Sequence, residues 1–129
     1  MAVDPNAPYD PDNIFARILR GEIPVVKVYE DEYALAFPDI APQARIHVLI
    51  IPRGSYICAT DFGERASEAE QAGLSRAIAH VATRLGVTGS GYRVISNTGA
   101  DAGQEVAHYH LHLLAGEPLG TKLIRPNAK

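Results

Sequence analysis

The sequence predicts a single α+β domain in which helices cover one face of an antiparallel sheet. Its 129 residues suffice for one hydrophobic core but not for two ordinary domains. Strand-like segments come first, one long helical pattern follows, and strand-like segments return before the C-terminus. Because the early segments are separated by connections as short as those of hairpins, antiparallel pairing is expected.

The chain begins with a segment that has little to bury. Residues 1–12 contain three prolines and three aspartates, which predicts a poorly ordered arm. The domain proper is expected over residues 13–129, with a tail from about residue 117. Asn13 suits the N-cap position of a helix, and the apolar spacing over residues 14–20 predicts a short helix with one apolar face.

Three segments then have the composition of strands. Residues 25–30 and 33–37 are rich in β-branched, aromatic and small apolar residues, and the polar pair Asp31 and Glu32 between them predicts a hairpin. Residues 45–52 predict a third strand. Its apolar run is typical of a strand inside a sheet rather than at its edge.

The second half contains the long helix and the last two strands. Ser67 followed by Glu70 matches a capping box, and an apolar stripe at spacings of three and four continues to Leu85. Residues 92–96 and 106–114 predict the fourth and fifth strands. The expected fold therefore has two helices and a five-stranded antiparallel sheet.

Composition excludes several classes of function. The 12 basic and 15 acidic residues give a net charge of −3, which argues against a nucleic-acid-binding protein. The single cysteine, Cys58, excludes an intrachain disulfide and disfavours a cysteine-based zinc site. No apolar stretch approaches the length of about 20 residues that a transmembrane helix needs, so no membrane partner is expected. The N-terminus lacks the features of a signal peptide, which predicts a cytoplasmic location.

Three of the five histidines alternate along the predicted fifth strand: His108, His110 and His112. On a strand this spacing places all three rings on one face, with Tyr109 and Leu111 on the other. A neutral imidazole is a nucleophile, and a protonated neighbour can donate to a phosphate or to a leaving group. Backbone N–H groups of the preceding glycine-bearing loop could meet the same anion. The row therefore fits phosphoryl or nucleotidyl transfer without a metal.

Two other interpretations of the histidine row remain open from the residues alone. Imidazole suits zinc, and neighbouring rings on a strand can share one ion. The row could also be a solvated face without chemistry. Metal binding would give a nucleotide- or zinc-binding module with little turnover, whereas nucleophilic chemistry would give an enzyme.

The motif His-φ-His-φ-His-φ-φ over residues 108–114, with φ apolar, resembles the signature of the histidine triad (HIT) superfamily. The similarity extends in order over about residues 13–120 and is greatest to the Hint branch. The segments that carry it are Ile14-Phe15, Glu22-Ile23-Pro24, residues 36–44, His47, Ile51-Pro52, Gly91-Tyr92-Arg93, Asn97 and Gly103-Gln104-Glu105-Val106.

The resemblance implies a homodimer in which two five-stranded sheets join into one of ten strands. It implies a nucleoside phosphoramidase that hydrolyses a P–N bond, also in aminoacyl-adenylate-like substrates, and releases a purine nucleoside monophosphate such as AMP. It implies neither a cofactor nor a metal. A dinucleoside polyphosphate hydrolase of the same superfamily is the alternative, although the continuation over residues 114–120 favours the Hint branch.

The resemblance also implies roles for individual residues. His110 corresponds to the nucleophile, His112 to the ring that contacts the phosphate and helps the amine depart, and His108 and His47 to residues that orient the nucleophile. Asp39 corresponds to the residue that binds the ribose hydroxyls. The base pocket would be formed by Phe15, Ile18, Ile23, Phe37 and Ile40, and the phosphate-side loop by Asn97, Gly103, Gln104 and Glu105.

Two positions depart from the pattern of many relatives. Glu105 stands where a serine often meets the phosphate, and a carboxylate there would repel that anion, so only its backbone N–H is expected to donate. Pro38 stands where some relatives have a histidine, which removes one polar group near the ribose.

Overall fold

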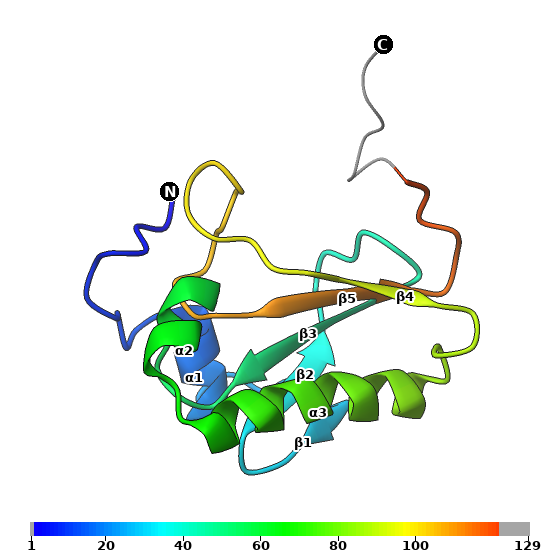
Figure 1. The fold of residues 1–129 in the computed structure, drawn as a ribbon, viewed down its shortest axis with the longest axis horizontal. Coiled ribbons are helices and arrows are strands. Elements are labelled where there is room, and N and C mark those ends of the chain that lie inside the picture. Colours follow the sequence, from blue (N-terminus) through cyan, green and yellow to red (C-terminus); the bar gives the residue numbers. More distant parts are fainter. Residues whose placement is uncertain (1, 122–129) are drawn as a thin grey trace.

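The computed structural model describes residues 2–121, so the predicted tail beyond residue 121 lies outside the described residues (Figure 1). No helix in the described part is both long and apolar enough to span a membrane. The elements, in chain order, are α1 (Ile14–Leu19), β1 (Tyr29–Glu30), β2 (Ala34–Pro38), β3 (Ile46–Pro52), α2 (Ala59–Arg65), α3 (Glu68–Leu85), β4 (Tyr92–Ile95) and β5 (Leu111–Ala115).

The five strands form one antiparallel sheet in the order β1-β2-β3-β5-β4, which confirms the predicted fold class. Strand β3 lies in the middle and pairs with β2 and β5, as its apolar run predicted. In the register of β3 and β5, Leu49 lies opposite His112 and His47 lies opposite Leu114. His47 and His112 are therefore diagonal neighbours on one face of the sheet.

Both faces of the sheet are covered, so the expectation of helices on one face only is wrong. Alternating residues of each strand point to opposite faces, and each set has its own helix. Helix α3 covers a larger cluster that contains Ala36, Ile50 and Leu113. Helix α1 covers the other face at one end, and its cluster comprises Phe15, Ile18, Leu35, Phe37, Leu49 and Ile51.

The predicted helix ends are confirmed by hydrogen bonds. The Asn13 side chain accepts from the Ala16 N–H at the start of α1. At the start of α3, the Ser67 side chain accepts from the Glu70 N–H, and the Glu70 carboxylate accepts from the Ser67 N–H. Gly86 ends α3 in the left-handed conformation at φ 69°, which glycine adopts without steric cost.

Helix α2 is a third helix within residues 2–121, whereas the sequence predicted two helices. It has weak local signals because its N-cap residue, Cys58, makes no side-chain cap and only Phe62 is buried. The Asp61 carboxylate instead accepts from the Ile57 N–H and from Arg65, which holds the first turn. These contacts depend on the folded path of the chain, so an amphipathic pattern could not indicate them.

Two predicted strands are shorter than expected at their N-terminal ends. The strand predicted over residues 25–30 is paired only at Tyr29–Glu30, although the Val28 N–H also donates to the Ala36 carbonyl. The preceding residues lie at the edge of the sheet, where Val26 is largely exposed. The strand predicted over residues 106–114 begins only at Leu111.

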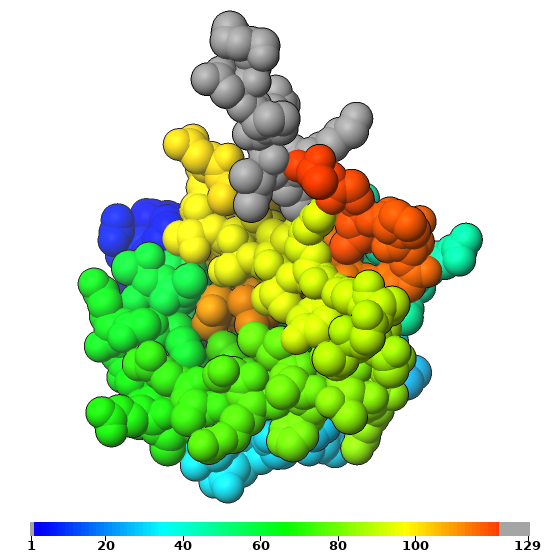
Figure 2. Space-filling model, turned by 45° about the vertical axis from the view of Figure 1, so that its right-hand side comes forward, coloured from blue at the N-terminus to red at the C-terminus, as the bar shows by residue number. Residues whose placement is uncertain are grey.

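The N-terminal segment follows the surface of the domain, where the sequence predicted a poorly ordered arm. Its odd-numbered residues Val3, Pro5, Ala7 and Tyr9 are half-buried, whereas the residues between them are exposed. In the space-filling view the segment, in blue, lies next to the green atoms around α2 and the yellow atoms of the loop that follows β4 (Figure 2). The segment is not extended throughout, because the Ala7 N–H donates to the Asp4 carbonyl and closes a turn.

Gly73 is expected to be required for packing of α3, and Gly63 of α2 provides the matched control. A Cβ at Gly73 would lie 2.5 Å from the Tyr33 ring, whereas a Cβ at Gly63 would meet nothing within 4 Å. Gly73→Ala should therefore lower the free energy of unfolding by about 1–3 kcal/mol through overpacking. Gly63→Ala should raise it by about 0.5–1 kcal/mol, because alanine favours the helix. Urea denaturation of both variants measures the two changes, and equal stabilisation would contradict the Tyr33 contact.

Candidate active site

The four histidines singled out by the sequence come together at one side of the sheet. His47 lies on β3, His112 lies on β5, and His108 and His110 lie in the extended segment that leads into β5. The His47 and His112 rings are 5.1 Å apart between centroids, and so are the His110 and His112 rings. The cluster thus combines neighbours along the chain with a residue from the adjacent strand.

The predicted strand over residues 106–114 is wrong for its first half. The predicted alternation of the side chains between the two faces of the sheet is nevertheless confirmed for Tyr109, His108 and His110. Tyr109 contacts Phe62 and packs on the α3 side, whereas His108 and His110 face Phe15. The ladder stops because Pro52, at the end of β3, has no N–H to offer the next partner.

His110 is held in one tautomer by a backbone group. Its Nδ1 lies 2.7 Å from the His108 carbonyl oxygen, and a carbonyl can only accept, so the ring proton sits on Nδ1. The Nε2 lone pair is then available. The Phe15 ring packs edge-on at 5.0 Å. Burial lowers the pKa of His110, against the raising effects of the hydrogen bond to the His108 carbonyl and of the charges of Asp39 and Glu105.

His47 and His112 form a directed hydrogen-bond relay. The Gln43 N–H donates to His47 Nδ1 at 3.0 Å, so the His47 proton sits on Nε2. That nitrogen lies 2.9 Å from His112 Nδ1 and donates to it, which leaves the His112 proton on Nε2. Burial lowers the pKa of His47, and burial together with the neighbouring His110 and His47 lowers the pKa of His112 to about 4. Both rings are therefore neutral donors at pH 7 rather than the protonated neighbours that the sequence suggested.

His108 is fully buried, with an exposed fraction of 0%. Its Nε2 donates to the Pro52 carbonyl at 2.8 Å, and the Tyr9 hydroxyl lies 2.6 Å from its Nδ1. Burial lowers the pKa of His108 to about 4, against the raising effect of the Pro52 carbonyl. Its side chain thus occupies the interior rather than the site surface, and Tyr9 is a contact that the sequence did not single out. The sequence indicates this contact only weakly, because Tyr9 stands out only as the one aromatic residue among residues 1–12.

Asp39 combines a turn role with a position in the site. Its Oδ1 accepts from the Ala41 N–H at 2.7 Å, and its Oδ2 lies 3.5 Å from His47 Nε2. Its backbone N–H donates to the His47 carbonyl, so the turn stays attached to β3. The carboxylate therefore lies beside the histidine relay.

Within the part of the chain that the structure describes, Asp39, His47 and His112 could jointly approach a metal ion, since one ligand atom of each lies within 4.8 Å of the others. His47 Nε2 carries the ring proton, however, because Nδ1 accepts from Gln43. Coordination through Nε2 would move that proton to Nδ1, where it would face the Gln43 N–H. The hydrogen bonds thus fit a proton relay better than a zinc site, and this set is not the histidine row that the metal hypothesis invoked.

The predicted base-pocket residues fall into three environments. Ile18 and Ile23 line a cavity of about 270 Å³ that also contains Leu35. Phe15 and Phe37 are buried with their rings edge-to-face at 5.7 Å. Ile40 is 97% exposed. The structure therefore brings four of the five side chains together under α1 and leaves the fifth in solvent.

The predicted phosphate-side loop is held by one buried side chain. Gln104 accepts from the Gly99 N–H through Oε1 and donates through Nε2 to the carbonyls of Ile57 and Val106. These bonds engage the side-chain oxygen and nitrogen of Gln104, and they join the loop to itself and to Ile57. Gly103 has φ 74°, Glu105 is exposed, and Asn97 is half-buried just after β4. Glu105 has no hydrogen-bond partner for its backbone N–H among residues 2–121.

The five-stranded antiparallel sheet carries a group of neutral histidines that are held by directed hydrogen bonds beside the Asp39 carboxylate, and this arrangement defines a histidine-based site. The HIT domain family matches residues 20–119, so the chain belongs to this family. This confirms the superfamily that the triad motif predicted.

Individual relatives agree with this assignment. The chain is 56% identical to a HIT-like protein of Azospirillum brasilense (91% of this chain, 96% of that one) and 46% identical to the purine nucleoside phosphoramidase of Escherichia coli (87% and 93%). Among solved structures, a HIT family hydrolase from Clostridium thermocellum is 38% identical with a TM-score of 0.80 (88% and 97%). A histidine triad protein from Clostridium difficile is 41% identical with a TM-score of 0.76 (85% and 95%).

The buried neutral state of His108 is expected to make stability depend on pH. Its pKa is about 4 when folded and near 6.5 when unfolded, so its contribution is complete above about pH 6.5 and is lost toward pH 4. Lowering the pH from about 7 to about 5 should cost about 2 kcal/mol for this residue. In His108→Asn the loss measured by urea denaturation should shrink by that amount. His80→Asn, on the exposed side of α3, should keep the wild-type loss, and an unchanged loss in His108→Asn would contradict the assignment.

Proposed function

We propose that this HIT-family hydrolase cleaves the P–N bond of purine nucleoside 5′-phosphoramidates through a covalent nucleotidyl-His110 intermediate. The observation that carries the proposal is the hydrogen bond from His110 Nδ1 to the His108 carbonyl, which leaves the Nε2 lone pair free. The 46% identity to the purine nucleoside phosphoramidase of Escherichia coli supports the substrate class. The product is a purine nucleoside monophosphate.

The first step forms a bond between His110 Nε2 and phosphorus while the P–N bond to the amine breaks. The anionic phosphate beside His112, together with Asp39, favours the protonated form of that ring in the complex. Protonated His112 then gives its Nε2 proton to the departing amine. The His110 ring carries the positive charge of the intermediate and retains its Nδ1–H bond to the His108 carbonyl.

The second step reverses the roles. Water attacks the phosphorus of nucleotidyl-His110, and His112 takes the proton of that water. The bond from phosphorus to His110 Nε2 breaks, which restores the neutral nucleophile and releases the monophosphate. The His47 N–H donates to His112 Nδ1 and orients the neutral ring before substrate binds. A proton taken from solvent onto Nδ1 in the complex uses that lone pair, so the charged ring is then held by the phosphate and by Asp39.

The environment of the site supports binding of a nucleotide. The Asp39 carboxylate can accept hydrogen bonds from two ribose hydroxyls. The apolar residues under α1, which include Phe15, Ile18 and Ile23, offer a wall for the base. The unpartnered backbone N–H of Glu105 can donate to the phosphate, whereas the side chain of Gln104 braces the loop.

We also propose that two copies associate through the free edge of β4, which extends the sheet to ten strands. Among residues 2–121, strand β4 pairs only with β5, so no described strand occupies its other edge. Tyr92 and Val94 are each 37% exposed on this strand, which leaves apolar surface at the edge. Light scattering coupled to size-exclusion chromatography tests this association, and a monomer at micromolar concentration would contradict it.

His110→Ala is expected to abolish turnover. Without the nucleophile, kcat for AMP release from adenosine 5′-phosphoramidate in the presence of EDTA should fall by about 10³-fold or more. His80→Ala serves as the control and should retain wild-type turnover. Mass spectrometry of rapidly quenched wild-type enzyme should show an AMP adduct on the peptide that contains His110.

Absence of wild-type turnover despite AMP binding would contradict the phosphoramidase proposal, and diadenosine polyphosphates would be tested next. Stoichiometric zinc in untagged protein, lost together with AMP binding in His110→Ala, would favour a zinc-dependent binding module instead.

The activity is expected to persist below the ordinary titration range of histidine. His110 must be neutral to attack, and burial lowers its pKa from 6.5. The acid limb of kcat/KM should therefore lie below about pH 6.5, and the need for a protonated His112 should make the rate fall again as the pH rises further. A pH–rate profile at low substrate concentration measures this limb. An acid limb above pH 7 would show that a group other than neutral, buried His110 controls the reaction.

A further inference from the structure

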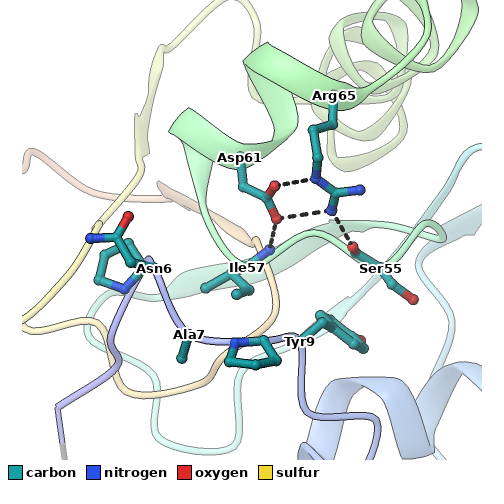
Figure 3. A pocket seen from close by; sticks show the side chains of 9 residues that line it. Asn6, Ala7, Tyr9, Ser55, Ile57, Asp61 and Arg65 are labelled. Atoms are coloured by element: carbon teal, nitrogen blue, oxygen red, sulfur yellow. Dashed lines mark hydrogen bonds and ion pairs between the residues drawn. The ribbon is translucent and has the colours of Figure 1, made fainter.

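A cavity of about 520 Å³ lies between the N-terminal segment and the domain (Figure 3). Asn6, Ala7 and Tyr9 lie on one side of this cavity, and the residues around α2 lie on the other. The charged residues there, Asp61 and Arg65, bind each other and the backbone of the domain. They form no hydrogen bond with the segment, so the position of the segment depends on other contacts.

The Tyr9 hydroxyl provides the attachment. Within the described residues, its bond to His108 is the one hydrogen bond that joins residues 2–9 to the rest of the domain. The following residues are held from α1, because the Asp10 carbonyl accepts from Asn13 and the Pro11 carbonyl accepts from Arg20. Tyr9 therefore stands where the segment joins the folded domain.

The direction of the bond between Tyr9 and His108 follows from the other side of the ring. His108 Nε2 lies 2.8 Å from the Pro52 carbonyl, which can only accept, so the ring proton is on Nε2. Nδ1 then has a lone pair, and the Tyr9 hydroxyl at 2.6 Å donates to it. The Tyr9 ring also packs edge-on against the His108 ring, with 5.7 Å between centroids. Loss of the hydroxyl would leave a fully buried acceptor without a partner.

His108 connects this contact to the nucleophile. The carbonyl oxygen of His108 accepts the His110 Nδ1 proton at 2.7 Å, so the orientation of the His110 ring depends on the placement of His108. The Phe15 ring approaches both histidines, at 6.5 Å from His108 and 5.0 Å from His110. One short N-terminal stretch thus supplies rings that border both histidines.

We infer that Tyr9 is a positioning residue for the site: its hydroxyl binds the Nδ1 lone pair that the Pro52 carbonyl leaves on His108 and so holds that ring in place, and His108 in turn orients His110 for attack. The catalytic part of this inference rests on the proposed function, whereas the structural part concerns the ring states alone. Tyr9 does not line the cavity that contains Ile18 and Ile23, so it acts on the chemical step rather than on nucleotide binding.

Tyr9→Phe tests the inference, because it removes only the hydroxyl and keeps the ring. Tyr29→Phe is the matched control, since it removes a hydroxyl that donates to Asp31 at 2.7 Å and keeps the ring, which stacks on His80 rather than on a histidine of the site. Ring nitrogens in protein labelled with ¹⁵N-histidine report tautomers by NMR. In Tyr9→Phe, the signal of the unprotonated His108 Nδ1 should shift because its hydrogen bond is lost while Nε2 stays bound to the Pro52 carbonyl, and the His110 Nδ1–H signal should broaden or shift. In Tyr29→Phe both should match wild type.

Kinetics give the second measurement. In Tyr9→Phe, kcat for the phosphoramidate should fall by about 5–50-fold while KM stays within about twofold, as expected for a misplaced nucleophile. Tyr29→Phe should retain wild-type kcat. Unchanged His108 and His110 signals in Tyr9→Phe would overturn the inference, and so would unchanged kcat in an active enzyme. If wild-type protein does not turn over, the proposed function fails, and the NMR comparison alone decides whether Tyr9 sets the ring states.

Discussion

Backbone groups decide where the protons of the buried histidines lie, and the site depends on this constraint. The Gln43 N–H, the Pro52 carbonyl and the His108 carbonyl each bind one ring nitrogen of a different histidine. A backbone amide can only donate and a carbonyl can only accept, so each contact selects one tautomer. Burial keeps the rings neutral by lowering their pKa values. A backbone carbonyl, rather than a charged side chain, thus fixes the proton of the proposed nucleophile, His110.

The sheet makes this arrangement possible because β3 serves two neighbours. Its pairing with β5 sets His47 diagonally across from His112, and its end at Pro52 stops the ladder before His110. The residues ahead of β5 are then free to use their backbone for side chains instead of for a strand partner. The same residues alternate between the α3 core and the α1 side, so Tyr109 anchors the segment while its neighbours enter the site.

The sequence predicts most of this fold because strong local signals coincide with the tertiary structure. The caps at Asn13 and Ser67, the apolar run of β3 and the alternation around His110 each have a physical basis in a few adjacent residues. Helix α2 and the covering of both faces depend on contacts between distant segments, so periodicity does not indicate them. The resemblance brings His47 and Asp39 into the site, yet it could not indicate that Tyr9 reaches His108 across 99 positions of sequence. The tautomers likewise require the folded backbone.

The strand order has a consequence for how the chain acquires its structure. Strand β5 is the last of the described strands to be synthesised, yet it lies between β3 and β4. Until it arrives, the apolar edge of β3 has no partner on that side, and β4 has no strand to join. Such long-range pairing is slow, and an open apolar edge favours association with other chains. A nascent chain that ends before residue 111 therefore exposes an unpaired apolar strand edge. The ribosome must release nearly the whole domain before β5 can pair with β3 and β4.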